Sequence, residues 1–274
     1  MRLRLVLVVC LLVVFLAWPA VAKDKFDHKH TKFQNILQSY VKDGAVDYDG
    51  LKHAGKGLRR YIGEMGSISE KRLKTFTRDQ KLAYWLNFYN ACVLDVISRN
   101  MPETSTSDGF RTPRQIKGLW TANKWGTPFG TRSLNSIEFD HLRKFRQSLW
   151  VLGVNRGTVG GGYLRSHAYT GAKVKQQLQT AVRRWMAQSG HFEVDVAGKE
   201  LRVSTYLMKH LPDLKREFMV RGELLGHTEA ENVFAHIYFK VGTDKAAKEM
   251  LRKGKFALLT LPYDQSLNEL KTAK

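Results

Sequence analysis

An apolar segment at residues 79–98 constrains the fold of this chain more than any other. Its apolar residues recur at helical spacing and form a stripe on one face: Leu82, Trp85, Tyr89, Cys92, Val93 and Val96. Two amides, Asn87 and Asn90, interrupt the apolar sequence three residues apart. A buried amide costs free energy unless it is hydrogen-bonded, so this pair either ties a loop to the helix or orients a ligand.

The N-terminus has the three parts of a secretory signal peptide. Two arginines precede an unbroken apolar stretch at residues 5–18, and Ala-Val-Ala at 20–22 is the small-x-small pattern that signal peptidase reads. The apolar stretch is short for a membrane span and suits the core of a signal peptide. We therefore expect residues 1–22 to be removed, leaving one exported domain at 23–274, in the periplasm or outside the cell, with no transmembrane segment.

The chain is strongly basic, with 45 Lys and Arg against 25 Asp and Glu and a formal net charge of +20. The expected signal peptide holds two arginines and no acidic residue, so the mature chain keeps +18. Such a charge attracts anions. Outside a bacterial membrane these are lipid head groups, lipopolysaccharide phosphates and peptidoglycan carboxylates. The basic residues are scattered in short clusters, so the charge is either a solvated surface or an anion site, and we expect no specific nucleic-acid partner.

Cysteine chemistry is limited in the expected mature chain. Removal of the signal peptide would take Cys10 with it and leave Cys92 as the only thiol, so no intramolecular disulfide could form. Cys92 lies on the apolar stripe, where a buried thiol is inert. The histidines are not spaced to put two imidazoles on one helical face, and we expect no metal site and no cofactor.

The hydrophobic patterns predict an α+β fold, a helix-rich single domain with short β-hairpins and a small sheet. Helices are predicted at 30–42, 58–65, 79–98, 135–145, 172–186, 229–240 and 245–253, with shorter ones after Ser67 and near Leu207. Hairpins are predicted at 124–134 and 192–204, and a buried strand at 150–154.

A glycine-rich loop at residues 155–163 follows the predicted buried strand. Its four glycines either bring backbone N–H groups close to an anion or serve a sharp turn that needs positive φ. Standard nucleotide-binding patterns do not fit the loop. In the predicted helix at 135–145, Glu138 and Arg143 are too far apart around the helix for an ideal surface ion pair, so they too have either a structural role or a role in orienting a ligand.

Several segments, taken in sequence order, resemble the domain of unknown function 547 family. They are residues 84–91, the hairpin and helix up to 143, the strand and loop around Asn155, the helix at 172–186, and residues 261–268. The resemblance extends from about 33 to 268 and includes the scaffold residues Trp85, Asn87, Asn90, Glu138 and Asn155.

The resemblance implies a thiol site that this chain has lost. Family members usually carry an Asn-Cys-Gly loop, a second Cys a few residues on and a His in the strand before it, which would suit a cysteine nucleophile. Arg156, Gly161 and Val151 stand at these positions here. An arginine cannot act as a nucleophile at neutral pH, but its guanidinium binds a carboxylate or phosphate through a bidentate fork.

Three functional hypotheses follow. The first is a non-catalytic or chemically altered member, a possible pseudoenzyme, that binds an anionic envelope component through a pocket holding Asn87, Asn90, Glu138, Asn155 and Arg156. The second is a hydrolase or transferase that uses other groups near the glycine-rich loop, such as Glu138, His167 or Tyr163. The third is a structural interaction module of the envelope without a small-molecule pocket.

Overall fold

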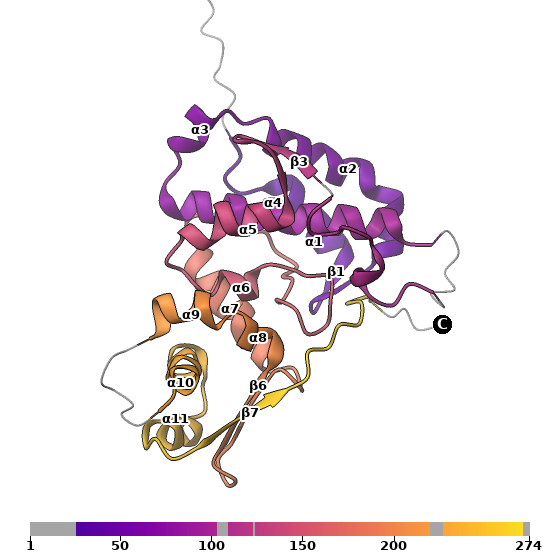
Figure 1. Ribbon diagram of the computed structural model, residues 1–274. Helices are drawn as coiled ribbons and strands as arrows, with labels where there is room; N and C mark the ends of the chain where they lie inside the picture. The colour runs from indigo at the N-terminus through magenta and orange to yellow at the C-terminus, as the bar shows by residue number, and fades with distance from the viewer. Residues whose placement is uncertain (1–25, 103–108, 123, 220–226, 271–274) are drawn as a thin grey trace, which may run out of the picture.

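The structure is a computed structural model that describes residues 26–102, 109–122, 124–219 and 227–270. The expected signal peptide, including Cys10, lies outside these residues. The N-terminal helices form the upper part of the molecule in Figure 1, and the C-terminal helices and sheet form the lower part. One cluster of buried hydrophobic side chains runs through both parts.

The upper part is mainly helical. Its elements are α1 (Thr31–Tyr40), β1 (Val41–Lys42), β2 (Ala45–Val46), α2 (Tyr48–Gly66), α3 (Glu70–Lys74), α4 (Arg78–Asn100), a 3-10 turn (Pro113–Gln115), β3 (Lys124–Thr127), β4 (Gly130–Ser133), α5 (Leu134–Asp140) and a second 3-10 turn (Leu142–Lys144). The structure confirms the hairpin predicted at 124–134. α2 begins well before the predicted helix at 58–65. The sequence pattern did not predict its first half because Gly50, Gly55 and Gly57 lower the helix propensity there.

The lower part combines helices with a three-stranded sheet. Its elements are α6 (Trp150–Gly153), α7 (Val174–Met186), β5 (Phe192–Asp195), β6 (Glu200–Ser204), α8 (Thr205–Lys209), α9 (Leu211–Phe218), α10 (Glu229–Val241), α11 (Lys245–Arg252) and β7 (Ala257–Leu261). β5 and β6 form the predicted antiparallel hairpin, and β7 pairs with β6 in parallel. The fold is therefore α+β, helix-rich and built with small sheets, as predicted.

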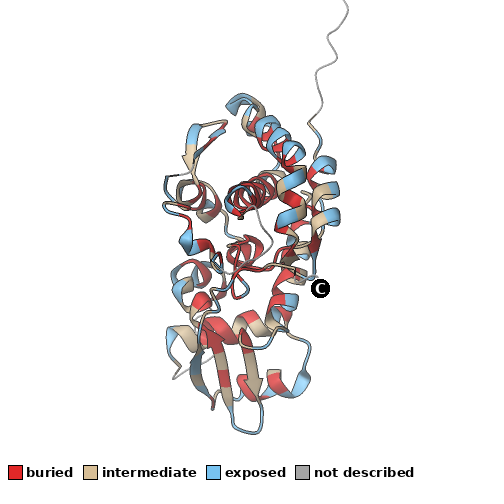
Figure 2. Cartoon of the chain, turned by 90° about the vertical axis from the view of Figure 1, so that its right-hand side faces the viewer, coloured by how far each residue is buried: buried red, intermediate tan, exposed pale blue. Residues whose placement is uncertain are grey.

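Helix α4 lies at the centre of the upper part. It begins with a capping box between Thr77 and Gln80, and every residue from 82 to 98 is buried. A helix buried on all sides must satisfy its polar side chains inside the protein. The buried residues shown in Figure 2 accordingly gather in the interior, while exposed residues cover the outer helices. None of the described helices is long and apolar enough to cross a membrane.

The two asparagines of α4 hold the backbone of the segment that follows α5. Nδ2 of Asn87 donates to the carbonyl of Tyr169 at 2.8 Å, and its Oδ1 accepts the N–H of Tyr169 at 2.9 Å. Nδ2 of Asn90 donates to the carbonyl of Gly153 at 3.0 Å, and its Oδ1 accepts the N–H of Asn155 at 2.7 Å. Each amide pairs with backbone groups that would otherwise be buried without partners. The asparagines thus tie a loop to the helix.

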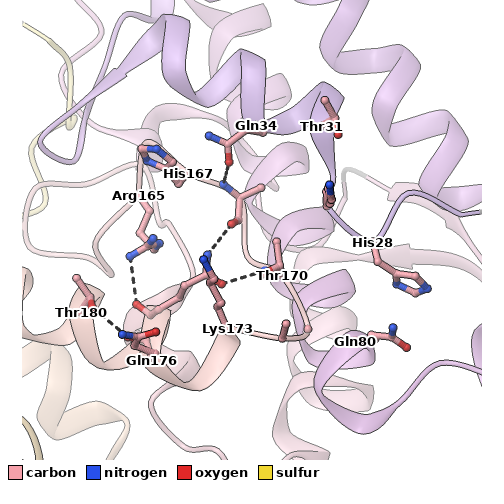
Figure 3. A pocket seen from close by; sticks show the side chains of 15 residues that line it. His28, Thr31, Gln34, Gln80, Arg165, His167, Thr170, Lys173, Gln176 and Thr180 are labelled. Carbon is pink, nitrogen blue, oxygen red and sulfur yellow. Dashed lines mark hydrogen bonds between the residues drawn. The ribbon is translucent and has the colours of Figure 1, made fainter.

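Two glutamines fix the same segment from its other side. Oε1 of Gln34 accepts the N–H of Ala168 at 2.9 Å. Gln177 accepts the N–H of Thr170 and donates to the carbonyl of Ala168, both at 2.9 Å. Figure 3 shows these bonds between α1, the extended segment and α7. The segment therefore keeps an extended backbone without belonging to a sheet.

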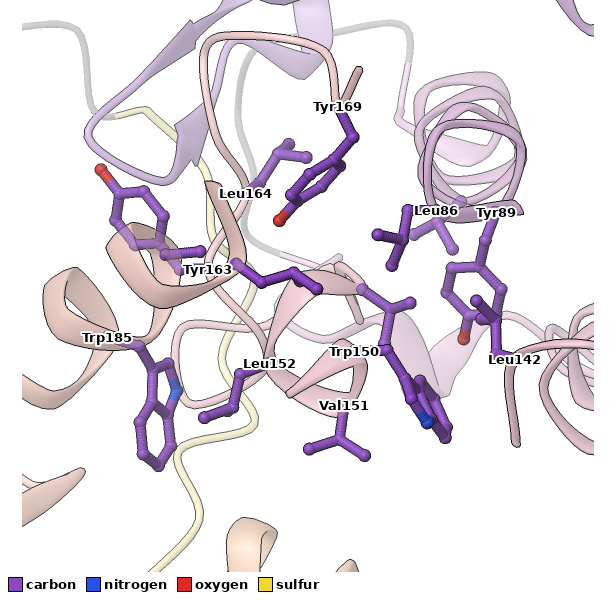
Figure 4. Close-up of a cluster of buried hydrophobic side chains, with 14 of the residues drawn as sticks. Leu86, Tyr89, Leu142, Trp150, Val151, Leu152, Tyr163, Leu164, Tyr169 and Trp185 are labelled. Carbon is purple, nitrogen blue, oxygen red and sulfur yellow. The ribbon is translucent and has the colours of Figure 1, made fainter. Parts of the chain in front are cut away.

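The strand predicted at 150–154 is wrong, because residues Trp150–Gly153 form the single turn of α6. The N–H of Val154 bonds to the carbonyl of Trp150 at 3.1 Å, which is helical spacing. Trp150, Val151 and Leu152 point in different directions into the hydrophobic cluster of Figure 4. A short run buried on every face has no period that distinguishes a strand from a helix.

Replacing Asn87 with alanine should destabilise the protein by about 2 kcal/mol or more, because the N–H and carbonyl of Tyr169 would stay buried without partners. Urea unfolding of the Asn87→Ala variant measures this change. Asn100→Ala is a matched control on the same helix, since Asn100 bonds to the carbonyl of Val96 at the exposed end. Equal losses for the two variants would contradict the role given to Asn87.

Candidate functional site

The glycine-rich loop at 155–163 uses its N–H groups within the protein. The N–H of Gly157 bonds to Oδ1 of Asn155 at 2.8 Å, and that of Gly161 bonds to the carbonyl of Thr158 at 3.2 Å. The N–H groups of Val159 and Gly160 bond, both at 2.9 Å, to carbonyls of the C-terminal segment at 264–266. These N–H groups are therefore not available to cradle an anion, and the loop is a turn.

Backbone geometry and close packing explain the glycines. Gly157 has a φ of 70°, which a side chain rarely adopts. A Cβ at Gly162 would lie 2.2 Å from the carbonyl oxygen of Val154, and one at Gly160 would lie within 3 Å of the backbone of Asp264. The short distance between Gly160 and Asp264 shows how closely the C-terminal segment covers the loop.

Asn268 anchors that C-terminal segment. Its Nδ2 donates to the carbonyl of Gly44 at 2.9 Å, and its Oδ1 accepts the hydroxyl of Tyr48 at 2.8 Å. Its backbone N–H bonds to the carbonyl of Gly157 at 3.2 Å. One residue near the C-terminus thus joins the N-terminal hairpin to the turn that carries Arg156.

Arg156 projects from this turn and forms a buried ion pair with Glu138 of α5. Nη2 of Arg156 lies 2.7 Å from Oε2 of Glu138, and the hydroxyl of Tyr89 donates to the other carboxylate oxygen at 2.5 Å. Burial alone would lower the pKa of Arg156, but the Glu138 carboxylate raises it well above its usual value. The guanidinium carbon lies 5.1 Å from the centroid of the Trp120 ring. Arg156 therefore carries a permanent charge in a fixed position.

Arg156 also lines a cavity of about 260 Å³. The other side chains around it come from the first 3-10 turn and the residues after it, the glycine-rich loop, α8 with its C-cap, and the C-terminal segment: Pro113, Arg114, Trp120, Thr158, Tyr206, Lys209, His210, Tyr263 and Gln265. The hydroxyls of Thr158 and Tyr263 lie 2.7 Å apart. None of the described residues lining this cavity is Asp or Glu. We call it the Arg156 pocket.

The five residues predicted to bind a ligand have two different positions. Arg156 lines the pocket, whereas Asn87, Asn90, Glu138 and Asn155 are buried behind its wall. Glu138 acts on the pocket through its ion pair, and Asn90 and Asn155 hold the backbone on both sides of Arg156. These three are positioning residues for Arg156, whereas Asn87 holds the backbone at Tyr169.

Sequence analysis missed most of the pocket. Arg114, Lys209 and His210 lie in three segments that no motif connects. Tyr263 belongs to the C-terminal segment that carries the family resemblance, and this was the one available signal. Packing alone brings these side chains to Arg156.

His210 has a buried carboxylate beside it. Its Nδ1 lies 3.6 Å from Oδ2 of Asp213, and Nε of Arg143 lies 3.0 Å from the other oxygen of this carboxylate. Asp213 belongs to α9, a helix that the sequence patterns did not predict. Arg143 therefore pairs with α9, while Glu138 pairs with Arg156.

The groups proposed for non-thiol catalysis have separate partners. Glu138 is paired with Arg156, and the hydroxyl of Tyr163 accepts a hydrogen bond from Arg184 at 3.0 Å. Nδ1 of His167 lies 3.1 Å from the hydroxyl of Ser166 at the surface. The structure thus gives no catalytic group built from Glu138, His167 and Tyr163.

Cys92 is the free cysteine among the described residues. Cys92 is fully buried, and burial raises the pKa of its thiol well above the usual value. This agrees with an inert thiol. The described part of the chain holds no group of three or more His, Cys, Asp or Glu side chains that could bind a metal ion.

The ion pair predicts a large difference between single and double substitutions. Arg156→Ala should cost about 3–5 kcal/mol of unfolding free energy, because it leaves the Glu138 carboxylate buried without its partner. The double variant Glu138→Gln with Arg156→Met removes both charges and should be clearly more stable than Arg156→Ala. Chemical unfolding of the three proteins tests this order, and a double variant less stable than the single one would contradict it.

Comparison with known proteins gives a family and no function. Residues 73–186 match the family described as "Protein of unknown function, DUF547". This range includes the asparagines of α4, Glu138, the turn with Arg156 and helix α7, whereas the wider resemblance at 33–72 and 187–268 lies outside it. No curated protein and no solved structure matches the chain. The match assigns residues 73–186 of the chain to the DUF547 family.

Proposed function

We propose that this chain is an exported protein that binds an anionic component of the cell envelope in the Arg156 pocket. The charge of the pocket lining carries this proposal. Arg114, Arg156 and Lys209 face a cavity of about 260 Å³, and no described lining residue is acidic. A cavity of this size suits one phosphate or carboxylate together with part of the group that carries it.

The fixed position of Arg156 supports recognition of an anion. Its Nη2 is held by Glu138, while its buried Nε has no hydrogen-bond partner among the described residues. A guanidinium that is already in place loses little conformational freedom when it binds an anion. The hydroxyls of Thr158 and Tyr263 can add hydrogen bonds to the same ligand. The pocket therefore offers both charge and directed donors.

The source of the anion follows from the expected compartment. An exported protein meets lipid head groups, lipopolysaccharide phosphates and the carboxylates of peptidoglycan peptides. A net charge near +18 would speed the encounter with any of them. The three ligands share the anionic group that the pocket recognises and differ in what is attached to it.

Binding measurements with matched variants test the proposal. We expect the purified protein to bind at least one of three probes: phosphatidylglycerol vesicles, lipopolysaccharide or a muramyl peptide. Arg114→Ala with Lys209→Ala should weaken that binding at least tenfold, since hydrogen bonds to charged groups contribute about 1.5–3 kcal/mol each. Both residues are exposed, so the fold should not suffer.

The control variant is Arg60→Ala with Lys71→Ala, which removes the same charge from exposed positions outside the pocket lining. Its affinity should stay within twofold of the unaltered protein. If the two double variants weaken binding equally, the charge acts as a diffuse surface and the pocket proposal fails. Absence of binding to all three probes also contradicts it.

His210 supports a second candidate, a hydrolase acting on a phosphate ester in the same pocket. His210 lines the cavity, and buried Asp213 lies 3.6 Å behind its Nδ1. Such a carboxylate can orient an imidazole as a general base for water, and these contacts are often long before substrate binds. The nearby arginines would then stabilise the charge that develops on the phosphoryl oxygens.

Hydrolysis of bis(p-nitrophenyl) phosphate tests this candidate. An enzyme that uses His210 should lose at least 100-fold in kcat in the His210→Gln variant, the lower range for losing a general base. The His167→Gln variant is the control, because His167 is exposed and does not line the Arg156 pocket. No turnover, or turnover that His210→Gln leaves unchanged, would leave binding as the function of the pocket.

A further inference from the structure

A second and larger cavity, which shares no lining residue with the Arg156 pocket, lies between the start of α1, the beginning of α4 and helix α7 (Figure 3). Its volume is about 770 Å³, roughly three times that of the Arg156 pocket. One wall is the extended segment that Gln34 and Gln177 hold in place. Because these bonds fix the wall, the cavity is formed before any ligand arrives.

Positive charge surrounds this second cavity. Lys29, Arg165 and Lys173 line it from three separate places in the chain, and no described lining residue is Asp or Glu. None of the three cations forms an ion pair with a described carboxylate, whereas the neighbouring Lys175 pairs with Asp79 at 3.2 Å. The carboxylate of Asp27 lies beside the lining and accepts the backbone N–H groups of Lys29 and Thr31 at 2.9 and 2.7 Å. The described lining itself therefore carries positive charge and no acidic side chain.

Arg165 has one long hydrogen bond, and its guanidinium carbon lies 5.7 Å from the centroid of the Tyr169 ring. Its Nη1 donates to the carbonyl of Gln177 at 3.4 Å, near the limit for a hydrogen bond. Its Nε is buried and has no partner among the described residues. A donor of this kind gains free energy when a ligand oxygen reaches it.

The rest of the lining is mixed. Ala168, Gly171 and Ala172 are small residues, and His28 and His167 also line the cavity. The other lining residues are amides and hydroxyls: Thr31, Gln34, Gln80, Thr170, Gln176, Gln177 and Thr180. An amide can both donate and accept, and a hydroxyl can do the same, so these groups match a ligand rich in hydroxyls. No Phe, Tyr or Trp lines the cavity. This disfavours single-stranded nucleic acid, whose bases stack on aromatic rings.

We propose that this cavity binds a segment of a hydroxyl-rich polyanion, with one carboxylate or phosphate on each of two or more successive units. Uronate oligosaccharides and glycerol phosphate chains both have this chemistry. The cations on separate segments contact successive anionic groups, and the amides and hydroxyls contact the hydroxyls between them. The site is separate from the Arg156 pocket and does not depend on it.

Fluorescence anisotropy with two labelled probes, trigalacturonate and a glycerol phosphate trimer, tests this site. We expect at least one of them to bind. Arg165→Gln with Lys173→Gln should weaken that binding at least tenfold. Lys175→Gln with Arg183→Gln is the matched control, since it removes two charges from exposed positions of α7 outside the lining. The control should change affinity less than twofold.

Other ligands and a variant of the Arg156 pocket test the chemistry and the location of this binding. Maltotriose, which has hydroxyls and no charge, should not compete, and an oligo(dT) strand should bind more weakly than the better probe. Arg114→Ala with Lys209→Ala should leave the affinity for these probes unchanged, because both residues line the Arg156 pocket and not this cavity. The proposal is overturned if neither probe binds, if the lining variant and its α7 control weaken binding equally, if maltotriose competes, or if oligo(dT) binds more tightly.

Discussion

The amide side chains of Asn87 and Asn90 are the interaction on which the rest of this structure depends. Each bonds a backbone N–H and a backbone carbonyl of the segment between α5 and α7. These bonds replace the neighbouring strand that an extended, buried backbone would normally need. They also place the N–H of Asn155, and therefore the residue after it, at a defined distance from the central helix. Arg156 owes its position to α4.

A charged residue at this position needs a partner inside the protein. Glu138 supplies it, and the hydroxyl of Tyr89 holds the second carboxylate oxygen. Where the family resemblance implies a cysteine nucleophile, this chain has a guanidinium that stays protonated and lines a basic cavity. Its buried Nε has no hydrogen-bond partner among the described residues. The position therefore holds a fixed cation, which cannot act as a nucleophile.

Parts of this account could be predicted from the sequence. The stripe of 79–98 predicts the central helix, and the alternation at 192–204 predicts its hairpin. The buried amides predict either a tie between helix and loop or contact with a ligand, and the structure shows the tie. Each of these depends on residues close together in sequence. The fold class follows from the same local patterns.

Other parts depend on packing between distant segments. The run at 150–154 is buried on all faces and carries no period, so α6 was predicted as a strand. β7 joins the sheet in parallel from the far end of the chain, and α9 brings Asp213 to His210. No local signal links Arg114, Lys209 and Tyr263 to Arg156. Of the five residues predicted to bind a ligand, only Arg156 lines the pocket, and the other four are buried beside it.

The side-chain Nε–H resonance of Arg156, followed by NMR while inorganic phosphate is added, tests the central claim most directly. The account predicts a saturable shift of this resonance, with much smaller changes at exposed arginines such as Arg60. A uniform, non-saturating response of all arginines would show that the anion meets only the general charge of the protein, and would contradict the proposed pocket.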